Sequence, residues 1–153
     1  MNNTPQFYMQ QALIEAQKAY NIGEAPIGAI VVHNREIIGR GYNTREKNQD
    51  ATCHAEIIAV RQACEVLNSW RLNNCDIYVT LEPCPMCAGA LVQTRIGKLY
   101  YGATDLKGGA AGSLFNLFSV DGLNHQVDVY GGILEEECSF ILKDFFNRLR
   151  KNK

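Results

Sequence analysis

The chain has 153 residues, of which 46% are hydrophobic and 20% are charged, and its formal net charge is −1. This composition excludes a disordered chain, and the length favours one domain over residues 1–153. No apolar stretch could span a bilayer and the first residues lack a signal-peptide pattern, so we expect a cytoplasmic protein without a membrane partner. A near-neutral charge is unusual for a nucleic-acid binder, although basic residues crowd the last stretch, 143–153.

The amino-terminal part of the chain predicts a helix, a hairpin and a second helix. The pair Thr4-Pro5 has the residue types of a helix cap and a first helical position. The β-rich runs 27–32 and 36–39 flank a three-residue turn and predict an antiparallel hairpin. A second helix should begin near His54, with an apolar stripe formed by Ile57, Val60, Cys64 and Leu67.

The carboxy-terminal part predicts alternating strands and helices around an irregular segment. In order, we expect a strand, a helix, a strand, a short helix, a strand and a long helix, at 76–81, 84–94, 98–102, 113–118, 126–130 and 134–150. The segment 105–112 is rich in glycine and cannot be regular. The core face of the last helix is expected to carry Cys138, Ile141, Leu142, Phe145 and Leu149.

The alternation of helices and strands indicates an α/β fold that is layered around a mixed sheet. More than twenty residues separate the strand that ends at Gly102 from the strand that begins at Gln126. A tight hairpin needs far fewer residues, whereas a parallel connection needs a crossover of a dozen or more. We therefore expect the last two strands to be parallel.

Two short segments carry residues that can bind a metal, Cys53-His54-Ala55-Glu56 and Pro83-Cys84-Pro85-Met86-Cys87. Cysteines three positions apart at the start of a helix place both sulfurs on one side, as tetrahedral zinc requires, and the helix amino terminus favours their thiolate forms. With His54 as a third ligand, the fourth position is left for water, which marks a catalytic site. Glu56 is the candidate to take a proton from water activated by zinc.

Spacing alone leaves the roles of His54 and Glu56 open. Residues two apart on an ideal helix point about 200° away from each other, so the two side chains converge only if His54 lies in an irregular first turn. A purely structural zinc would need a fourth protein ligand, for which Cys53 could compete. The cysteines outside the motif are otherwise expected to be small buried hydrophobes, namely Cys53, Cys64, Cys75 and Cys138.

The order His54-Ala55-Glu56, a strand, and then Pro-Cys-x-x-Cys resembles the signature of the zinc-dependent cytidine/deoxycytidylate deaminase superfamily. The resemblance implies a three-layer α/β/α cytidine-deaminase-like domain with a central mixed five-stranded sheet. It also implies one zinc ion per subunit, held by His54, Cys84 and Cys87, and a proton shuttle at Glu56.

Nearly the whole chain resembles one branch of that superfamily, the bacterial tRNA-specific adenosine deaminases. The matching segments are 26–29, 69–72, 78–89, 112–114, 124–125, 132–134 and 145–146. The resemblance implies hydrolytic deamination of adenosine to inosine at the wobble position of an arginine tRNA anticodon, by zinc-activated water with a glutamate proton shuttle. It also implies a homodimer, and an apolar cluster is compatible with its contact surface, namely Leu114, Phe115, Leu117 and Phe118.

The same resemblance implies five contacts with the tRNA anticodon stem-loop. Asn43 would contact a base edge, and Asp105 a ribose 2′-hydroxyl. Phe146 would pack against a neighbouring nucleotide, while Lys107 and Arg150 would lie near phosphates. Structural alternatives stay open: a turn after a strand for Asn43, a loop-capping acid for Asp105, a residue at the rim of the core for Phe146, and helix-dipole complementarity for Arg150.

Two other functions stay open on the sequence. A deaminase of free guanine, cytosine or their nucleosides would use the same zinc chemistry, but it would not need Phe146 or the basic carboxy-terminal end. A non-catalytic, zinc-bearing RNA-binding module would not need Glu56 beside an open zinc position.

Overall fold

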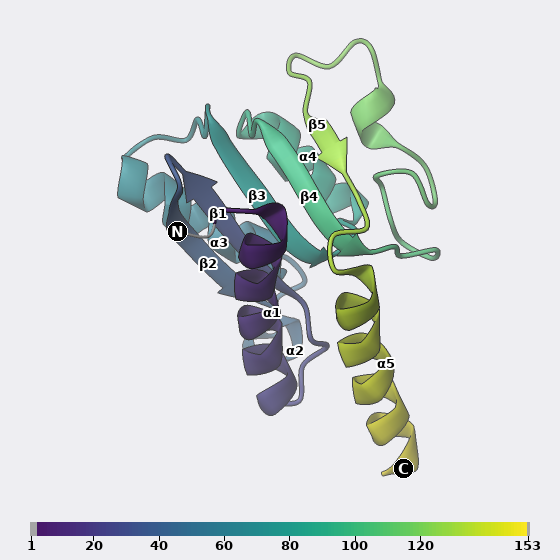
Figure 1. Ribbon diagram of the computed structural model, residues 1–153. Helices are drawn as coiled ribbons and strands as arrows, with labels where there is room; N and C mark the ends of the chain where they lie inside the picture. Colours follow the sequence, from purple (N-terminus) through teal and green to yellow (C-terminus); the bar gives the residue numbers. More distant parts are fainter. Residues whose placement is uncertain (1–2, 153) are drawn as a thin grey trace.

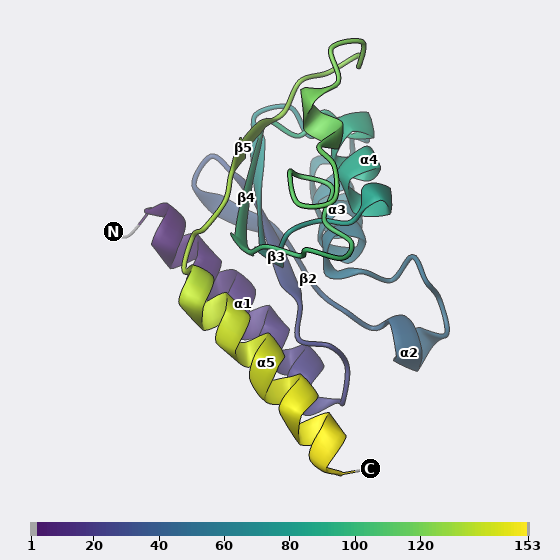
Figure 2. The same ribbon diagram turned by 90° about the vertical axis from the view of Figure 1, so that its right-hand side faces the viewer.

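A five-stranded mixed sheet lies between two layers of helices in the computed structural model, which describes residues 3–152 (Figure 1). The strands are β1 (Gly28–His33), β2 (Glu36–Tyr42), β3 (Cys75–Leu81), β4 (Lys98–Ala103) and β5 (Asp128–Tyr130). The helices are α1 (Pro5–Asn21), α2 (Arg45–Asn48), α3 (Ala55–Leu67), α4 (Pro85–Gln93), the 3-10 helix η1 (Leu117–Ser119) and α5 (Glu135–Lys151). Helices α3 and α4 cover one face and α1 and α5 the other (Figure 2), which confirms the three-layer α/β/α fold.

The strand order is β2-β1-β3-β4-β5. Strand β1 is antiparallel to both β2 and β3, so β2 and β3 run in the same direction, and β3, β4 and β5 are parallel to one another. The predicted parallel crossover between the last two strands is confirmed. The carboxyl ends of β2, β3 and β4 therefore meet at one edge of the sheet, and the segments that follow these strands converge there.

Helix α3 packs on β2 through alanines rather than through the larger residues of the predicted stripe. Its fully buried residues are Ala55, Ala59 and Ala63, whereas only Val60 of the stripe is buried and the other three members are half-buried. Glycines on β2 are the cause, because a Cβ atom at Gly39 or Gly41 would lie 2.2 or 2.4 Å from a carbonyl oxygen of α3. Small residues on both elements let the two backbones approach closely.

Two predictions in the carboxy-terminal part were wrong. Residues 113–118 do not form a helix, because amide groups in this segment donate hydrogen bonds to residues outside it. Only Leu117–Ser119 make one 3-10 turn. Leu149 does not belong to the core face of α5 and is 47% exposed. The last turns of α5 extend beyond the sheet (Figures 1 and 2), so no strand lies beneath them.

Helices α1 and α5 lie side by side on the second face of the sheet (Figure 2). The Tyr20 hydroxyl group donates to Asp144 Oδ2 at 2.6 Å, and the Tyr20 ring meets Phe145 edge-on with 5.4 Å between the ring centroids. Helix α1 is also tied to β2, because the buried Glu15 carboxylate pairs with Arg40 at 3.0 Å.

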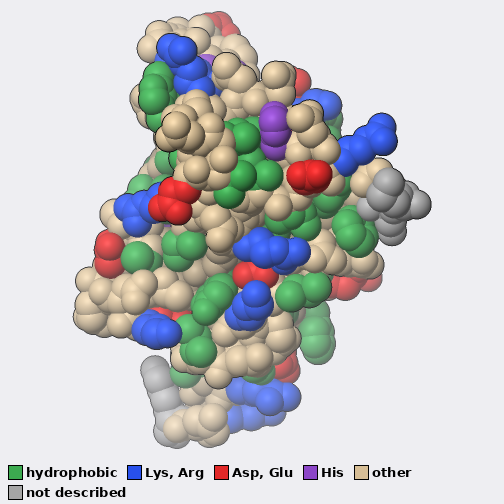
Figure 3. Space-filling model, turned by 90° about the vertical axis from the view of Figure 1, so that its left-hand side faces the viewer, with side chains coloured by type: hydrophobic (Ala, Val, Ile, Leu, Met, Phe, Trp, Pro, Cys, Tyr) green, Lys and Arg blue, Asp and Glu red, His purple; other side chains and the backbone are tan. Residues whose placement is uncertain are grey.

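Acidic and basic side chains are intermixed on the side of the surface shown in Figure 3. Within residues 3–152, no helix is long and apolar enough to cross a membrane.

The cysteines outside the metal-binding motif are free thiols, mostly in the interior. Cys53, Cys75 and Cys138 are buried as predicted, while Cys64 is half-buried. Burial raises the pKa of Cys75 to about 11 and that of Cys138 to about 12. These two thiols therefore stay protonated at neutral pH and behave as small hydrophobic groups.

Candidate active site

Three side chains that can bind a metal lie at the edge of the sheet where the chain leaves β2 and β3. His54 is the N-cap of α3 and Cys84 is the N-cap of α4, both with extended backbones (φ −81°, ψ 155° and φ −75°, ψ 172°). Cys87 lies in the first turn of α4 and is buried. His54 Nδ1 lies 3.6 Å from Cys84 Sγ and 3.5 Å from Cys87 Sγ. The structure thus brings the three predicted ligands together.

The spacing of these three atoms fits a tetrahedral zinc ion. Bonds of about 2.0–2.1 Å to nitrogen and 2.3 Å to sulfur, at a tetrahedral angle, separate the two ligand atoms by about 3.6 Å. Both measured distances agree with this value. The metal-binding group within residues 3–152 consists of these three side chains, and the Cys53 thiol instead accepts a hydrogen bond from Asn48. The group can therefore hold a metal and leave its fourth position open.

Glu56 contributes a carboxyl group that is only 4% exposed. It lies in the first turn of α3, and both Glu56 and His54 line one cavity because His54 lies outside the helix. The two side chains were expected to converge only if His54 lay outside the regular part of the helix, and it does. Burial raises the pKa of Glu56 to about 7. A carboxyl group with this pKa can both accept and release a proton near neutral pH.

The two thiols of the metal-binding group differ in charge before a metal binds. The neighbouring Cys87 side chain and His54 lower the pKa of Cys84 to about 4. The neighbouring Cys84 side chain and burial raise the pKa of Cys87 well above its usual value. Cys84 is therefore a thiolate at neutral pH, whereas Cys87 gives up its proton only when a metal replaces it.

A cavity of about 180 Å³ opens over this group. Its lining residues come from the segments that follow β2, β3 and β4, together with the segment before β1: Ala25, Ile27, Asn43, Arg45, His54, Ala55, Glu56, Leu81, Glu82, Cys84 and Asp105. Pockets for drug-sized ligands measure roughly 300–1,000 Å³, so this cavity suits a smaller group.

Asn43 and Asp105 line the cavity and also bond to nearby backbone. Asn43 Nδ2 donates to the carbonyl oxygen of Ala25 at 3.2 Å, and its Oδ1 accepts from the amide of Arg45 at 3.1 Å. Asp105 Oδ1 accepts from two amides of the loop that follows it, both at 3.2 Å. The turn and the loop cap expected as alternatives are thus present. An amide has a second donor and further lone pairs, and a carboxylate has a second oxygen, so both side chains keep capacity for a ligand.

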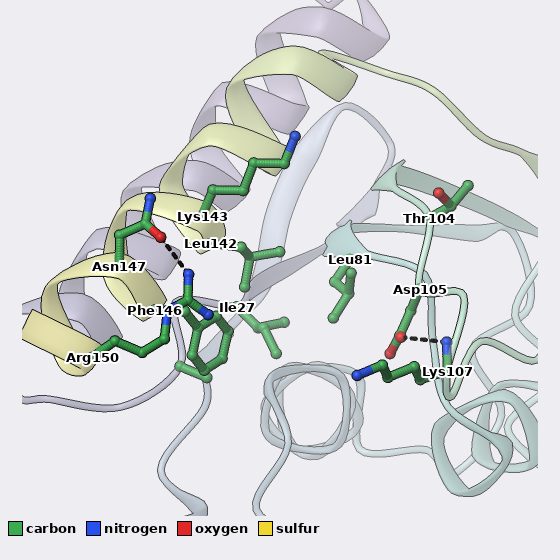
Figure 4. Close-up of a pocket in the computed structure, with 11 residues that line it drawn as sticks. Ile27, Leu81, Thr104, Asp105, Lys107, Leu142, Lys143, Phe146, Asn147 and Arg150 are labelled. Carbon is green, nitrogen blue, oxygen red and sulfur yellow. Dashed lines mark hydrogen bonds between the residues drawn. The ribbon is translucent and has the colours of Figure 1, made fainter.

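A larger cavity of about 840 Å³, which is shown in Figure 4, shares lining residues with the first one and adjoins it. Phe146 and Arg150 line it from α5, and Lys107 reaches it from the loop after β4. Phe146 is 42% exposed, so it is not a core residue, in contrast to the buried Phe145. The two cavities share the lining residues Ala25, Ile27, Leu81 and Asp105. All five predicted substrate contacts therefore border two adjoining cavities.

Several lining residues were missed in the sequence. Lys143 and Asn147 face the larger cavity with Phe146 and Arg150, at intervals of three and four residues along α5. The helical period could have identified them once Phe146 was chosen. Arg45 belongs to the four-residue helix α2, which no hydrophobic pattern predicts because none of its residues is buried.

The chain is similar in sequence to known deaminases over almost its full length. Residues 3–150 match the family described as MafB19-like deaminase. The chain is 51% identical to the tRNA-specific adenosine deaminase of Bacillus subtilis (strain 168) over 148 residues, which cover 97% of this chain and 92% of the relative. It is 47% identical to the tRNA-specific adenosine deaminase of Haemophilus influenzae (strain ATCC 51907 / DSM 11121 / KW20 / Rd) over 146 residues, which cover 95% and 84%.

Solved structures of deaminases share the fold. A structure from a study of A-to-I editing by tRNA:A34 deaminases at the wobble position of transfer RNA has a TM-score of 0.86 and 47% identity, and the match covers 89% of this chain and 99% of that one. The guanine deaminase from Bacillus subtilis has a TM-score of 0.65 and 30% identity, with coverage of 99% and 95%.

These relationships include the residues that form the site. The family match spans both halves of the metal-binding motif and the residues that line both cavities. The similarity to the Bacillus relative covers nearly all of both chains at about half identity. The chain belongs to the tRNA-specific adenosine deaminase family.

Proposed function

We propose that this protein hydrolyses adenosine to inosine at the wobble position of an arginine tRNA anticodon, with zinc as its metal. The observation that carries the proposal is a buried Glu56 carboxyl group beside a three-ligand metal-binding group, in a small cavity that adjoins a larger one. The small cavity suits one base, and the larger cavity suits its neighbours in a single-stranded loop.

The reaction converts adenosine and water to inosine and ammonia, and the chain supplies the proton transfers. Zinc bound to His54, Cys84 and Cys87 would supply a Lewis acid that activates water near neutral pH. Glu56 takes a proton from that water and delivers it to N1 of the adenine ring. The water oxygen bonds to C6, the carbon that carries the exocyclic amine. Glu56 then moves the second proton from that oxygen to the amine, so that the C6–N bond breaks, ammonia leaves and the C6 carbonyl group of inosine forms. Burial of Glu56 raises its pKa above the usual carboxyl value, which brings the uptake and release of a proton closer to neutral pH.

The cavity residues provide recognition of RNA. Asn43 has a remaining donor and acceptor with which to read the edge of the flipped base. Hydrogen bonds within residues 3–152 reach only Oδ1 of Asp105, so its Oδ2 can accept from a ribose 2′-hydroxyl, a group that DNA lacks. Phe146 offers an exposed ring for stacking, and Lys107 and Arg150 offer cations for the phosphates.

The direct test is incubation of the zinc-loaded protein with an unmodified arginine tRNA that has adenosine at the wobble position. Inosine should appear at that position alone, and it should not appear with Glu56→Ala. The exposed carboxylate of Glu65 on α3 provides a matched control, because Glu65→Ala should leave the rate unchanged. Failure of the zinc-loaded wild-type protein to form inosine would disprove the proposed substrate.

Free guanine is the second substrate to assay, because the fold is shared with a guanine deaminase that is 30% identical. Release of ammonia from guanine without formation of inosine in tRNA would favour that activity. We expect the opposite result, since the aromatic and basic residues at the larger cavity have no role with a free base.

We also propose that the protein is a homodimer that acts in the cytoplasm. Leu114 is 58% exposed and Phe115 is 44% exposed, so both can meet a second copy. Phe118, which the predicted contact surface included, is buried in the core. Light scattering should give twice the chain mass of 17.1 kDa. A monomer at micromolar concentration would contradict the homodimer.

A further inference from the structure

A second buried carboxylate, that of Glu82, lies beside the metal-binding group and has no role in the proton transfers. It follows β3 directly, is 2% exposed and precedes the segment that carries Cys84 and Cys87. Burial of a carboxylate is unfavourable unless hydrogen bonds compensate for the lost water. Burial alone would raise the pKa of Glu82, but hydrogen bonds from Ser113 and from backbone amides hold that pKa below its usual value.

Every donor to this carboxylate comes from the loop after β4. Oε1 accepts from the amide of Asp105 at 3.0 Å and from the hydroxyl group of Ser113. Oε2 accepts from the amides of Ala111 and Ser113 at 2.9 and 3.1 Å. Glu82 therefore binds both ends of residues 105–113, the glycine-rich segment that cannot form regular structure by itself.

The loop also approaches Glu82 more closely than most residue types would allow. A Cβ atom at Gly109 would lie 2.3 Å from the Glu82 carboxyl carbon. The next residue, Ala110, donates its amide to the carbonyl oxygen of Pro83 at 2.8 Å. The loop is thus wrapped around the residues that immediately precede Cys84.

We infer that Glu82 is a positioning residue that holds Asp105 in place for the substrate ribose. Asp105 lines both cavities, and its backbone amide is fixed by Glu82 Oε1. The inference rests on the proposed function, because it assigns Glu82 a part in recognition of the RNA through Asp105. The Glu82 side chain thereby links the segment that carries Cys84 and Cys87 to the loop that carries Asp105.

The variant Glu82→Gln tests the inference with little change of shape. The substitution replaces one carboxylate oxygen by an NH2 group, which cannot accept a hydrogen bond. At least one N–H group of the loop would therefore face another donor. A hydrogen bond to a charged group contributes about 1.5–3 kcal/mol, which predicts amide exchange in residues 104–113 that is faster by about tenfold or more. The KM for the anticodon stem-loop should rise about tenfold with kcat nearly unchanged, because uniform binding is lost. Metal content should stay the same, and Glu65→Gln on α3 is the matched control with wild-type exchange and KM.

A double-mutant cycle with Asp105→Ala separates positioning from a general structural effect. If Glu82 acts through Asp105, the double variant loses no more kcat/KM than the worse single variant. Additive losses would overturn the inference, as would wild-type exchange in residues 104–113 of Glu82→Gln.

Two further outcomes remain decisive. If the wild-type protein forms no inosine in tRNA, the proposed function and the role of Glu82 in RNA recognition both fail. Amide hydrogen exchange in residues 104–113 then shows only whether Glu82 holds the loop.

If Glu82→Gln does not fold, Ser113→Ala replaces it, since this variant removes one of the four hydrogen-bond donors to Glu82. A several-fold rise in loop exchange and in KM is then expected, and no rise in either would overturn the inference.

Discussion

The metal-binding group and the proposed recognition surface are built from different kinds of element. The metal-binding group comes from the starts of two helices, α3 and α4, which pack closely on the sheet. The proposed recognition surface combines an irregular loop, 104–113, with the face of α5 that lines the larger cavity. The hydrophobic core fixes the first region. In the second region polar contacts with Glu82 hold the loop, and α5 is held by its apolar face, which includes Cys138 and Phe145. We therefore expect that chemistry and recognition can be lost separately.

The largest effect is expected from Glu56→Ala. General acid–base catalysis contributes about 10²- to 10⁴-fold, and Glu56 serves two transfers, so kcat should fall by about 10³-fold or more. Metal content and affinity for the anticodon stem-loop should stay near wild type, because Glu56 is not one of the three ligands. A turnover assay and metal analysis decide this, and unchanged turnover would remove Glu56 from the mechanism. Loss of turnover also excludes a non-catalytic RNA-binding module.

A truncation that removes residues 146–153 should have the second-largest effect. It deletes Phe146 and Arg150 from the larger cavity but leaves the metal-binding group intact. Deamination of tRNA should fall by about 100-fold, since stacking of a base is worth about 1–3 kcal/mol and a phosphate contact is lost as well. Zinc content should stay at one per chain. Full activity of the truncated protein would contradict the anticodon-loop arrangement.

The metal-binding group itself should respond to pH. The raised pKa of Cys87 keeps its thiol protonated at neutral pH, so zinc binding releases at least this proton. The apparent affinity should therefore fall about tenfold for each unit by which the pH is lowered, for each proton released. Competition with a chelator at pH 6 and pH 8 measures it, with Cys64→Ser as the control outside the group. An affinity that is independent of pH would contradict the thiol assignment.

The smallest effect is expected from Tyr20→Phe. The bond from Tyr20 to Asp144 ties α1 to α5 just before Phe146, so its loss should loosen the cavity face of α5. Loss of one such exposed hydrogen bond predicts a rise of about twofold to fivefold in KM for tRNA with kcat unchanged. Tyr130→Phe on the distant strand β5 should leave both constants as they are. Equal effects of the two variants would refute a role for the α1–α5 contact.

Part of the metal-binding group could be predicted from local spacing, because Cys84 and Cys87 are three positions apart at the start of one helix. Spacing left the roles of His54 and Glu56 open, and the family resemblance assigned them. The parallel connection to β5 was also predictable, because the connecting segment has more than twenty residues and a tight hairpin needs far fewer. The five recognition residues came from family resemblance, since nothing in the local pattern of Asn43 or Asp105 distinguishes a ligand contact from a turn.

What the sequence did not predict depends on contacts between distant segments. The burial of the α3 alanines depends on glycines of β2, and the exposure of Leu149 depends on where the sheet ends. The role of Glu82 depends on a loop that follows it by more than twenty residues. Helical periodicity reports which side chains share a face, but it does not report what lies opposite that face.

The position of the α5 end beyond the sheet has a consequence for how such enzymes diversify. Exposed residues that are not part of the core change the free energy of unfolding by about 0.5 kcal/mol or less when substituted. Mutations at Phe146 or Leu149, which are 42% and 47% exposed, can therefore accumulate without loss of the folded protein. Substitutions at this end of the molecule can therefore change the proposed contacts with RNA while the metal-binding group stays the same.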